Sequence, residues 1–331
     1  MHDSETTPRF VLLGDISTDV LVHTSTPWQH GSDNPAHVEF LPGGSAANQA
    51  SCLAGLNCEV HLIGAVGRDW LGVVHEQALI ASGVTVHLRQ ASHLRTGCTV
   101  VLVDETGERT MYPDRGANSA LRTVDIPEML FRTATHLHVS GYSLLNESTR
   151  PAALAAIALA RERRLSWSVD PASASLLMHV GPHRFRDWTR GATLCFPNLD
   201  EGMVLTGKQD AETIESELSQ DYRVLVLKLG ADGARVVANG TRIEAPSGSL
   251  ESTEVVDTTG AGDAFCAAFL ATWARQDSLR EALERASAAA GRAVARVGAR
   301  QANAVWRKLL EASPSVPDGA VPLKPSMPSA G

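Results

Sequence analysis

The stretch DTTGAGDAF, residues 257–265, places two glycines directly before an aspartate and an apolar run. Gly260 and Gly262 leave the backbone open to close approach, and the residues after Asp263 have the composition of a buried helix. The first N–H groups of a helix have no intrahelical partner and carry a partial positive charge. The stretch therefore predicts an anion site at Gly260, Ala261 and Gly262, with Asp263 beside it.

An aspartate beside a bound phosphate suits phosphoryl transfer, because it can orient a hydroxyl nucleophile and accept its proton late in the reaction. The same residues also fit a simpler interpretation, a helix that begins near Gly260 with an acidic residue in its first turn. The stretch alone leaves both interpretations open. The chain contains neither G-x-x-x-x-G-K-[ST] nor a strand-linked G-x-G-x-x-G, which excludes two common phosphate-binding loops.

The overall composition is typical of a globular protein that binds small molecules. The 331 residues are 44% hydrophobic and 20% charged, enough for one large α/β domain or two smaller ones. A net charge of −8 without a basic stripe argues against a nucleic-acid partner. The five cysteines form no C-x-x-C pair, which favours free thiols in a reducing compartment. Without an apolar leader or a run of transmembrane length, we expect a cytoplasmic protein with no membrane partner.

Short apolar runs alternate with longer Ala- and Leu-rich stretches along most of the chain. This alternation predicts β-α-β units, and hence a three-layer α/β/α domain with a central, mostly parallel sheet. The expected strands are 10–13, 60–63, 136–140, 165–169, 193–196 and 224–229, and the expected helices are 45–55, 70–81, 149–164, 261–275 and 279–297.

Two segments depart from this alternation and predict a small β-sheet lid. The runs TGCTVVLVD and ERTMYPD flank a D-E-T-G turn, as the strands of an antiparallel hairpin do. The other segment, residues 20–41, has prolines and a glycine between short extended stretches. Ordinary surface hairpins would give the same pattern. We expect a domain over 9–312 with a lid formed mainly by about 20–42 and 87–118, and a disordered tail over the proline-rich 313–331.

Three further motifs accompany DTTGAGDAFCAAFL: LPGGSAANQA (41–50), FPNLDE (196–201) and VLKLGADGA (226–234). Together they resemble the ribokinase-like, or PfkB, family of ATP-dependent carbohydrate kinases, from about Arg9 to Trp306. The resemblance departs at Asn57, where the family usually has a small residue such as Gly, and Asn tolerates the left-handed backbone of such a turn. The resemblance implies a ribokinase-like fold, ATP with Mg²⁺, a small-molecule sugar substrate and a homodimer.

The resemblance also implies roles on the nucleotide side of the site. Asp263 matches the catalytic base, and Gly260, Ala261 and Gly262 match the anion hole for the transferring phosphoryl group. Asn198 and Glu201 match an N-x-x-E motif that organises magnesium and the phosphates through water, although an Asn and a Glu at this spacing could equally form a turn and a helix cap. Further nucleotide contacts are matched by Lys228, Gly230, Gly233 and Ser287.

On the sugar side, the resemblance matches Asp19, Gly43, Gly44 and Asn48 to substrate-binding positions. Carboxylate and amide groups bind vicinal hydroxyls well in a concave site. Arg115 could reach a substrate carboxylate or phosphate, or it could be an exposed loop arginine. Asp15 could join the sugar site or cap the turn after the first strand.

Asp257 and two histidines raise the question of metal ions. In the family the acid at the position of Asp257 helps to bind a monovalent cation, which makes activation by K⁺ plausible; the alternative is an aspartate that caps a turn. His136 and His138 alternate on one expected strand and point to the same face. Because no third ligand follows at a recognisable spacing, we expect a structural pair rather than a zinc site.

The sequence therefore predicts an enzyme that transfers the γ-phosphoryl group of ATP to a sugar hydroxyl. A nucleoside kinase of the same family would need an apolar patch for the base, for which the lid offers Trp28, Phe40 and Tyr112. A phosphosugar kinase would need added cations, such as Arg95 and Arg115. A non-catalytic sugar-binding regulator is disfavoured because the residues at 198, 201 and 263, which match the family's catalytic motifs, are all present.

Overall fold

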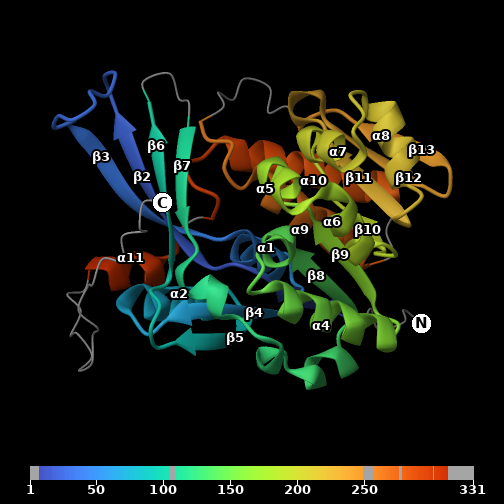
Figure 1. Ribbon diagram of the computed structural model, residues 1–331, viewed down its shortest axis with the longest axis horizontal. Coiled ribbons are helices and arrows are strands. Elements are labelled where there is room, and N and C mark those ends of the chain that lie inside the picture. The colour runs from blue at the N-terminus through green and yellow to red at the C-terminus, as the bar shows by residue number, and fades with distance from the viewer. Residues whose placement is uncertain (1–6, 105–108, 249–255, 276–277, 301, 312–331) are drawn as a thin grey trace, which may run out of the picture.

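The fold is organised around a nine-stranded sheet in the order β13-β12-β11-β10-β9-β8-β1-β4-β5 (Figure 1). The computed structural model describes residues 7–104, 109–248, 256–275, 278–300 and 302–311, so the expected tail lies outside the described residues. Strands β11 through β5 in this order run parallel, and the β12–β13 hairpin adds an antiparallel edge. The strands are β1 (Arg9–Leu13), β4 (Glu59–Gly67), β5 (Val84–Ala91), β8 (His136–Ser140), β9 (Ser166–Asp170), β10 (Leu194–Cys195), β11 (Val224–Lys228), β12 (Ala234–Ala238) and β13 (Thr241–Ala245).

Helices cover both faces of this sheet because its strands send alternate apolar side chains into two separate cores. In β1, Phe10 and Leu12 enter one core, whereas Val11 and Leu13 enter the other. The first core is closed by α1 (Ser45–Gly55), α9 (Ala261–Trp273) and α10 (Leu279–Val294). The second is closed by α3 (Gly141–Leu145), α4 (Arg150–Glu162), α5 (Ala174–Val180), α6 (Pro182–Thr189), α7 (Leu199–Thr206) and α8 (Ala211–Leu218). The predicted three-layer α/β/α architecture is confirmed.

A separate four-stranded sheet, which we call the lid, has the order β3-β2-β6-β7. Its strands are β2 (Ser17–Thr24), β3 (Ala36–Gly43), β6 (Gly97–Val103) and β7 (Arg109–Asp114). The runs predicted as a hairpin pair antiparallel as β6 and β7, and the lid stands at one side of the large sheet (Figure 1). Its limits differ from the expected segments, since β2 already begins at Ser17 and residues 87–91 belong to β5 of the large sheet.

The C-terminal helix ties the lid to the body. Helix α11 (Ala304–Glu311) packs on α2 (Trp70–Ala81), where Trp306 is buried against Val74 and Ala78. The Trp306 indole N–H also donates to the carbonyl oxygen of Phe40 in β3, at 3.2 Å. Among the residues described, no helix combines the length and apolar composition that a membrane crossing needs.

The two alternating histidines of β8 form the expected structural pair. His136 Nε2 and His138 Nδ1 each lie 2.7 Å from the hydroxyl oxygen of Ser168. Burial lowers the pKa of both rings, that of His138 to about 4, so both stay neutral near pH 7. Within the described part of the chain, no group of three or more His, Cys, Asp or Glu side chains could hold a metal ion directly, and the five cysteines are free thiols.

Candidate active site

Asp263 lies in the first turn of α9 and is held by three side chains of α1. Ser45 Oγ donates to Asp263 Oδ1 at 2.7 Å, Asn48 Nδ2 donates to Oδ2 at 2.8 Å, and Gln49 Nε2 donates to Oδ1 at 3.1 Å. The three donors share one face of α1 because they stand three and four residues apart. Ser45 and Gln49 were missed in the sequence, although both lie in the GGSAANQA motif. Burial raises the pKa of Asp263, against the effect of these hydrogen bonds.

The backbone in front of Asp263 can approach a ligand closely. Gly260 has a φ of 77°, and a Cβ atom there would clash with the backbone of Ala299, so this position requires glycine. A Cβ atom at Gly262 would lie 3.7 Å from Lys228 Nζ, which places the Lys228 ammonium next to the bare backbone of Gly262. The Ala261 N–H donates to the carbonyl oxygen of Thr258 at 3.3 Å, so the backbone of Gly260 and Gly262 is the part left to approach a ligand. The positive end of the helix and the Lys228 ammonium together favour an anion.

Lys228 ends β11 and forms a buried ion pair with Asp170 at the end of β9. Lys228 Nζ lies 2.9 Å from Asp170 Oδ2, and Cys266 Sγ donates to the same oxygen at 3.2 Å. Burial would raise the pKa of Asp170, but the Lys228 ammonium holds it below its usual value. Asp170 was missed in the sequence. The available signal was its position as a carboxylate at the carboxyl end of a predicted parallel strand. Its partner Lys228 is distant in the sequence and becomes its neighbour only in the folded chain.

Asn198 and Glu201 form the helix cap that the sequence allowed as an alternative. Asn198 Oδ1 accepts the Glu201 N–H and Glu201 Oε2 accepts the Asn198 N–H, each at 2.8 Å, which is a capping box at the start of α7. A β-bridge between Asn198 and Lys228 brings this cap beside the Lys228–Asp170 pair. Burial raises the pKa of Glu201 to about 7, and Lys228 opposes the rise. The nucleotide role of both residues stays a prediction.

The other predicted nucleotide contacts lie after β11 and in α10. Gly230 opens a short 3-10 turn (Gly230–Asp232), and Gly233 leads into β12. Ser287 is buried in α10, and its hydroxyl has no hydrogen-bond partner among the residues that the structure describes. Asn57 adopts the left-handed backbone expected of it, with a φ of 58°.

The lid joins the large domain at the start of β2 and the end of β3, and this junction contains Asp19, Gly43 and Gly44. A Cβ atom at Gly43 would clash with the Asp19 carboxylate, which explains the glycine. Burial raises the pKa of Asp19 to about 7, and the nearby Arg300 guanidinium opposes the rise. Arg300 is buried and was missed in the sequence, because nothing in its local motif marks it.

Arg115 is not an exposed loop arginine. Its Nη2 lies 2.9 Å from Asp15 Oδ1, and the two side chains are 23% and 15% exposed. Asp15 is thereby engaged by a cation rather than by the turn after β1. Among the described residues, several buried polar atoms around this region have no hydrogen-bond partner: Asn48 Oδ1, Gln49 Oε1, Arg115 Nε, and Arg300 Nε and Nη2. Buried groups of this kind usually find a partner, which a polar ligand could supply.

Two of the three aromatic candidates for a nucleoside base, Phe40 and Tyr112, do not face this region. Strand register places Phe40, Val20, Val100 and Tyr112 in one row across the lid. Since neighbouring residues of a strand point to opposite faces, this row lies on the face opposite Asp19. The nucleoside alternative therefore loses Phe40 and Tyr112 as base-stacking residues within one subunit.

Asp257 is bound by an arginine side chain and by two backbone N–H groups. Arg109 Nη2 lies 2.7 Å from Asp257 Oδ1, which also accepts the Thr259 N–H at 2.6 Å. Asp257 Oδ2 accepts the Gly298 N–H at 2.7 Å. The Arg109 guanidinium therefore already places a positive charge at the carboxylate for which the resemblance implies a monovalent cation.

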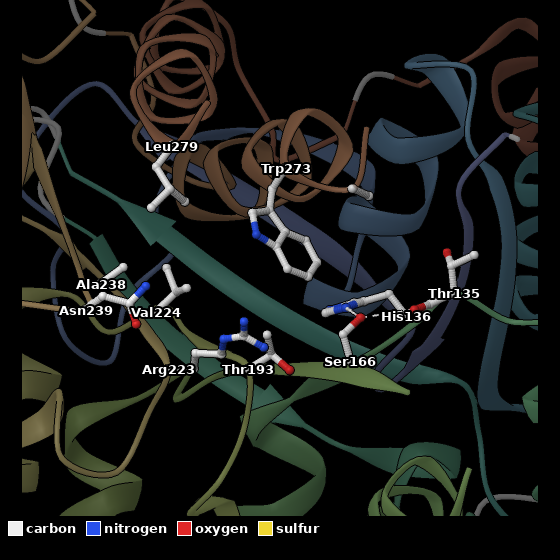
Figure 2. Close-up of a pocket in the computed structure, with 11 residues that line it drawn as sticks. Thr135, His136, Ser166, Thr193, Arg223, Val224, Ala238, Asn239, Trp273 and Leu279 are labelled. Atoms are coloured by element: carbon white, nitrogen blue, oxygen red, sulfur yellow. Dashed lines mark hydrogen bonds between the residues drawn. The ribbon is translucent and has the colours of Figure 1, made fainter. Parts of the chain in front are cut away.

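A cavity of about 420 Å³ lies elsewhere, at the edge of the large sheet where the parallel strands begin (Figure 2). Its lining includes His136, Ser166, Arg223 and Trp273, and Figure 2 shows Trp273 and His136 side by side. None of the predicted site residues lines it. The candidate active site is therefore at the opposite edge, where β9 and β11 end.

This arrangement defines a class of protein. An α/β phosphotransferase needs an aspartate at a helix start and cationic groups near the transferred phosphate, at the carboxyl ends of parallel strands. The site described above has both. The family model for pfkB family carbohydrate kinases matches residues 8–306. The chain belongs to this family of carbohydrate kinases.

Known proteins resemble the chain over nearly its whole length. It is 35% identical over 301 residues to a protein of Halopiger xanaduensis named ATP-dependent ribose-1-phosphate kinase, covering 89% of this chain and 94% of the relative. The structure of Arabidopsis thaliana ribokinase complexed with ribose and ATP has a TM-score of 0.74 at 24% identity, covering 93% of this chain and 100% of that one. A protein from Escherichia coli solved in complex with ATP and Mg²⁺ has a TM-score of 0.78 at 22% identity, covering 88% and 94%.

Proposed function

We propose that the protein transfers the γ-phosphoryl group of ATP to a hydroxyl of a ribose-type sugar, and that ribose 1-phosphate is its preferred substrate. The observation that carries the proposal is the Asp263 carboxylate, which lies at the open start of α9 and is oriented by three donors of α1. The names of the Halopiger relative and of the Arabidopsis ribokinase complex support the choice of sugar and of ATP.

In this mechanism the substrate oxygen attacks the γ-phosphorus, the bond to the bridging oxygen of ADP breaks, and Asp263 receives the hydroxyl proton. Ser45 and Gln49 donate to Oδ1 and Asn48 donates to Oδ2, so Oδ2 keeps more capacity to accept the hydroxyl proton. The amides at Gly260–Gly262 and the Lys228 ammonium stabilise the negative charge on the phosphoryl oxygens.

The position of the transferred phosphoryl group at the start of α9 also suggests where the nucleotide and the magnesium ion would bind. Lys228, Gly230, Gly233 and Ser287 are the proposed nucleotide contacts. Glu201 and Asp170 are buried carboxylates that share the single Lys228 ammonium, so a further positive charge fits there. Glu201 Oε1, which takes no part in the capping box, would hold Mg²⁺ through water, and the bound ion would neutralise charge on the ATP phosphates.

Two arginines favour a substrate that carries its own phosphate. Arg115 Nε and two nitrogens of Arg300 are buried without a hydrogen-bond partner among the described residues. Guanidinium groups match the geometry of phosphate oxygens. Asp19 and Asn48 would bind the sugar hydroxyls, and Gly43 and Gly44 leave room for the Asp19 carboxylate and for the backbone before β2.

The test is the release of ADP from ATP with ribose, ribose 1-phosphate, fructose and adenosine as acceptors. We expect the highest kcat/KM with ribose 1-phosphate. The Arg115→Leu variant should lower that kcat/KM by about 10-fold to 100-fold, the effect of losing a charged hydrogen bond. Turnover of free ribose by the same variant is the control and should change little. Equal loss for both sugars would contradict the phosphate contact, and turnover of adenosine alone would favour the nucleoside kinase.

The lid also supports a homodimer as part of this proposal. The row Phe40–Val20–Val100–Tyr112 makes one lid face apolar, and Phe40 and Tyr112 are 48% and 53% exposed. A second copy of the lid would cover this face.

The Phe40→Asp variant is therefore expected to be a monomer in sedimentation velocity, because a charge in an apolar interface is costly to bury. The matched control is Val124→Asp, at a position that is 86% exposed outside the lid, and it should leave the dimer intact. A wild-type monomer at all protein concentrations would refute the dimer.

A further inference from the structure

Arg109, the first residue of β7, reaches from the lid to the loop that precedes α9. Its Nη2 forms an ion pair with Asp257 Oδ1 at 2.7 Å. Its Nη1 donates to Thr258 Oγ1 at 3.0 Å and to Thr259 Oγ1 at 2.8 Å. One guanidinium therefore binds each of the three residues directly before Gly260, where the anion hole begins.

The ion pair between Arg109 and Asp257 is largely buried. The side chain of Arg109 is 17% exposed and that of Asp257 is 4% exposed. Asp257 also accepts the N–H groups of Thr259 and Gly298, so it joins the loop before α9 to the segment after α10. That segment continues into Ala299, whose backbone packs against Gly260. The Arg109–Asp257 pair is the centre of a network around the start of α9.

We propose that Arg109 is an internal cation and a positioning residue for phosphoryl transfer: its guanidinium does at Asp257 what a bound monovalent cation would otherwise do. It neutralises the buried carboxylate and fixes the loop, so that the amides at Gly260–Gly262 face the transferring phosphoryl group. The catalytic part of this proposal, the positioning of the amides for phosphoryl transfer, rests on the proposed function. The chain consequently needs no K⁺ or Na⁺ for activity.

Simple electrostatics supports this assignment. A guanidinium keeps its charge at any working pH and holds several donors in one plane, which suits a carboxylate and two hydroxyls at once. A second cation at Asp257 would lie close to this guanidinium in a poorly hydrated place, where like charges repel strongly. Because Arg109 belongs to β7, the order of the phosphate-binding loop also depends on the position of the lid.

The experiment compares the wild type with R109Q and R109K in KCl and in tetramethylammonium chloride at equal ionic strength. The wild type should show the same kcat in both salts. R109Q should lose about 10-fold to 100-fold in kcat in tetramethylammonium, the range for a lost charged hydrogen bond, and should regain part of it in KCl. R109K keeps a cation at this place and should respond to KCl less than R109Q.

A second readout needs no turnover. The melting temperature of R109Q should be higher in KCl than in tetramethylammonium chloride, because K⁺ can now occupy the freed carboxylate, whereas that of the wild type should not differ. The matched control is R235Q, which removes another partly buried arginine from the buried Glu215 and should show no preference for K⁺.

Stimulation of the wild type by K⁺, or an R109Q protein whose melting temperature and turnover ignore K⁺, would overturn the inference. If no sugar is phosphorylated, the proposed function fails while the melting temperatures still decide the role of Arg109.

Discussion

Replacement of Asp263 by Asn is expected to abolish phosphoryl transfer while ATP binding and the fold persist. The amide keeps the size of the side chain but cannot receive the hydroxyl proton, and loss of a positioned base lowers kcat by about 10²-fold to 10⁴-fold. The measurement is single-turnover transfer from ATP together with nucleotide binding by calorimetry. The control is Asp187→Asn, at a carboxylate that is 71% exposed on α6. Turnover near the wild-type rate in Asp263→Asn would remove Asp263 from the mechanism.

The buried carboxylates of the site together set the acid limb of the pH profile, since burial raises the pKa of Asp19 and of Glu201 to about 7 and also raises that of Asp263. Burial raises the pKa of Asp263, so its carboxylate is protonated at a higher pH than that of an exposed aspartate. Only the ionised form can accept a proton. Activity should therefore fall as the pH decreases through this raised pKa, and the fall should begin above the ordinary range of aspartate.

Replacement of Lys228 by Met is expected to produce the largest loss of stability. It would leave the Asp170 carboxylate buried without its cation, and removing one member of a buried pair costs about 3–5 kcal/mol. The unfolding free energy from urea titration measures this loss. The double variant with Asp170→Leu removes the orphaned charge as well and should recover part of the stability.

Two outcomes would contradict this account of Lys228. A Lys228→Met protein as stable as the wild type would mean that the ion pair contributes little to folding. A variant that is destabilised but binds ATP with unchanged affinity would mean that the ammonium does not reach the phosphates in the complex. The lowered pKa of Asp170 provides a further check on the ion pair. The pair should stabilise the fold fully above about pH 3.9, the pKa of an aspartate in the unfolded chain. This stabilisation should be lost as the pH falls from there through the lower pKa of Asp170 in the folded protein.

Long, strongly patterned elements could be predicted from the sequence with small shifts at their ends. Helix α1 was expected at 45–55 and is found at Ser45–Gly55, and α9 was expected at 261–275 and is found at Ala261–Trp273. Helices α5 and α8, and the β12–β13 hairpin, were missed. They are 5–8 residues long, too short for a hydrophobic period to stand out from neighbouring loops.

The sequence by itself determined the start of α9, because the glycines, the alanine and the aspartate of that turn are neighbours in the chain and their geometry is local. Only the tertiary structure decided which groups surround it. Ser45 and Asp263 are 218 residues apart, and Lys228 and Asp170 are 58 apart. Contacts over such separations depend on the order of strands in the sheet and on the closure of long loops, and no local pattern of residues encodes them.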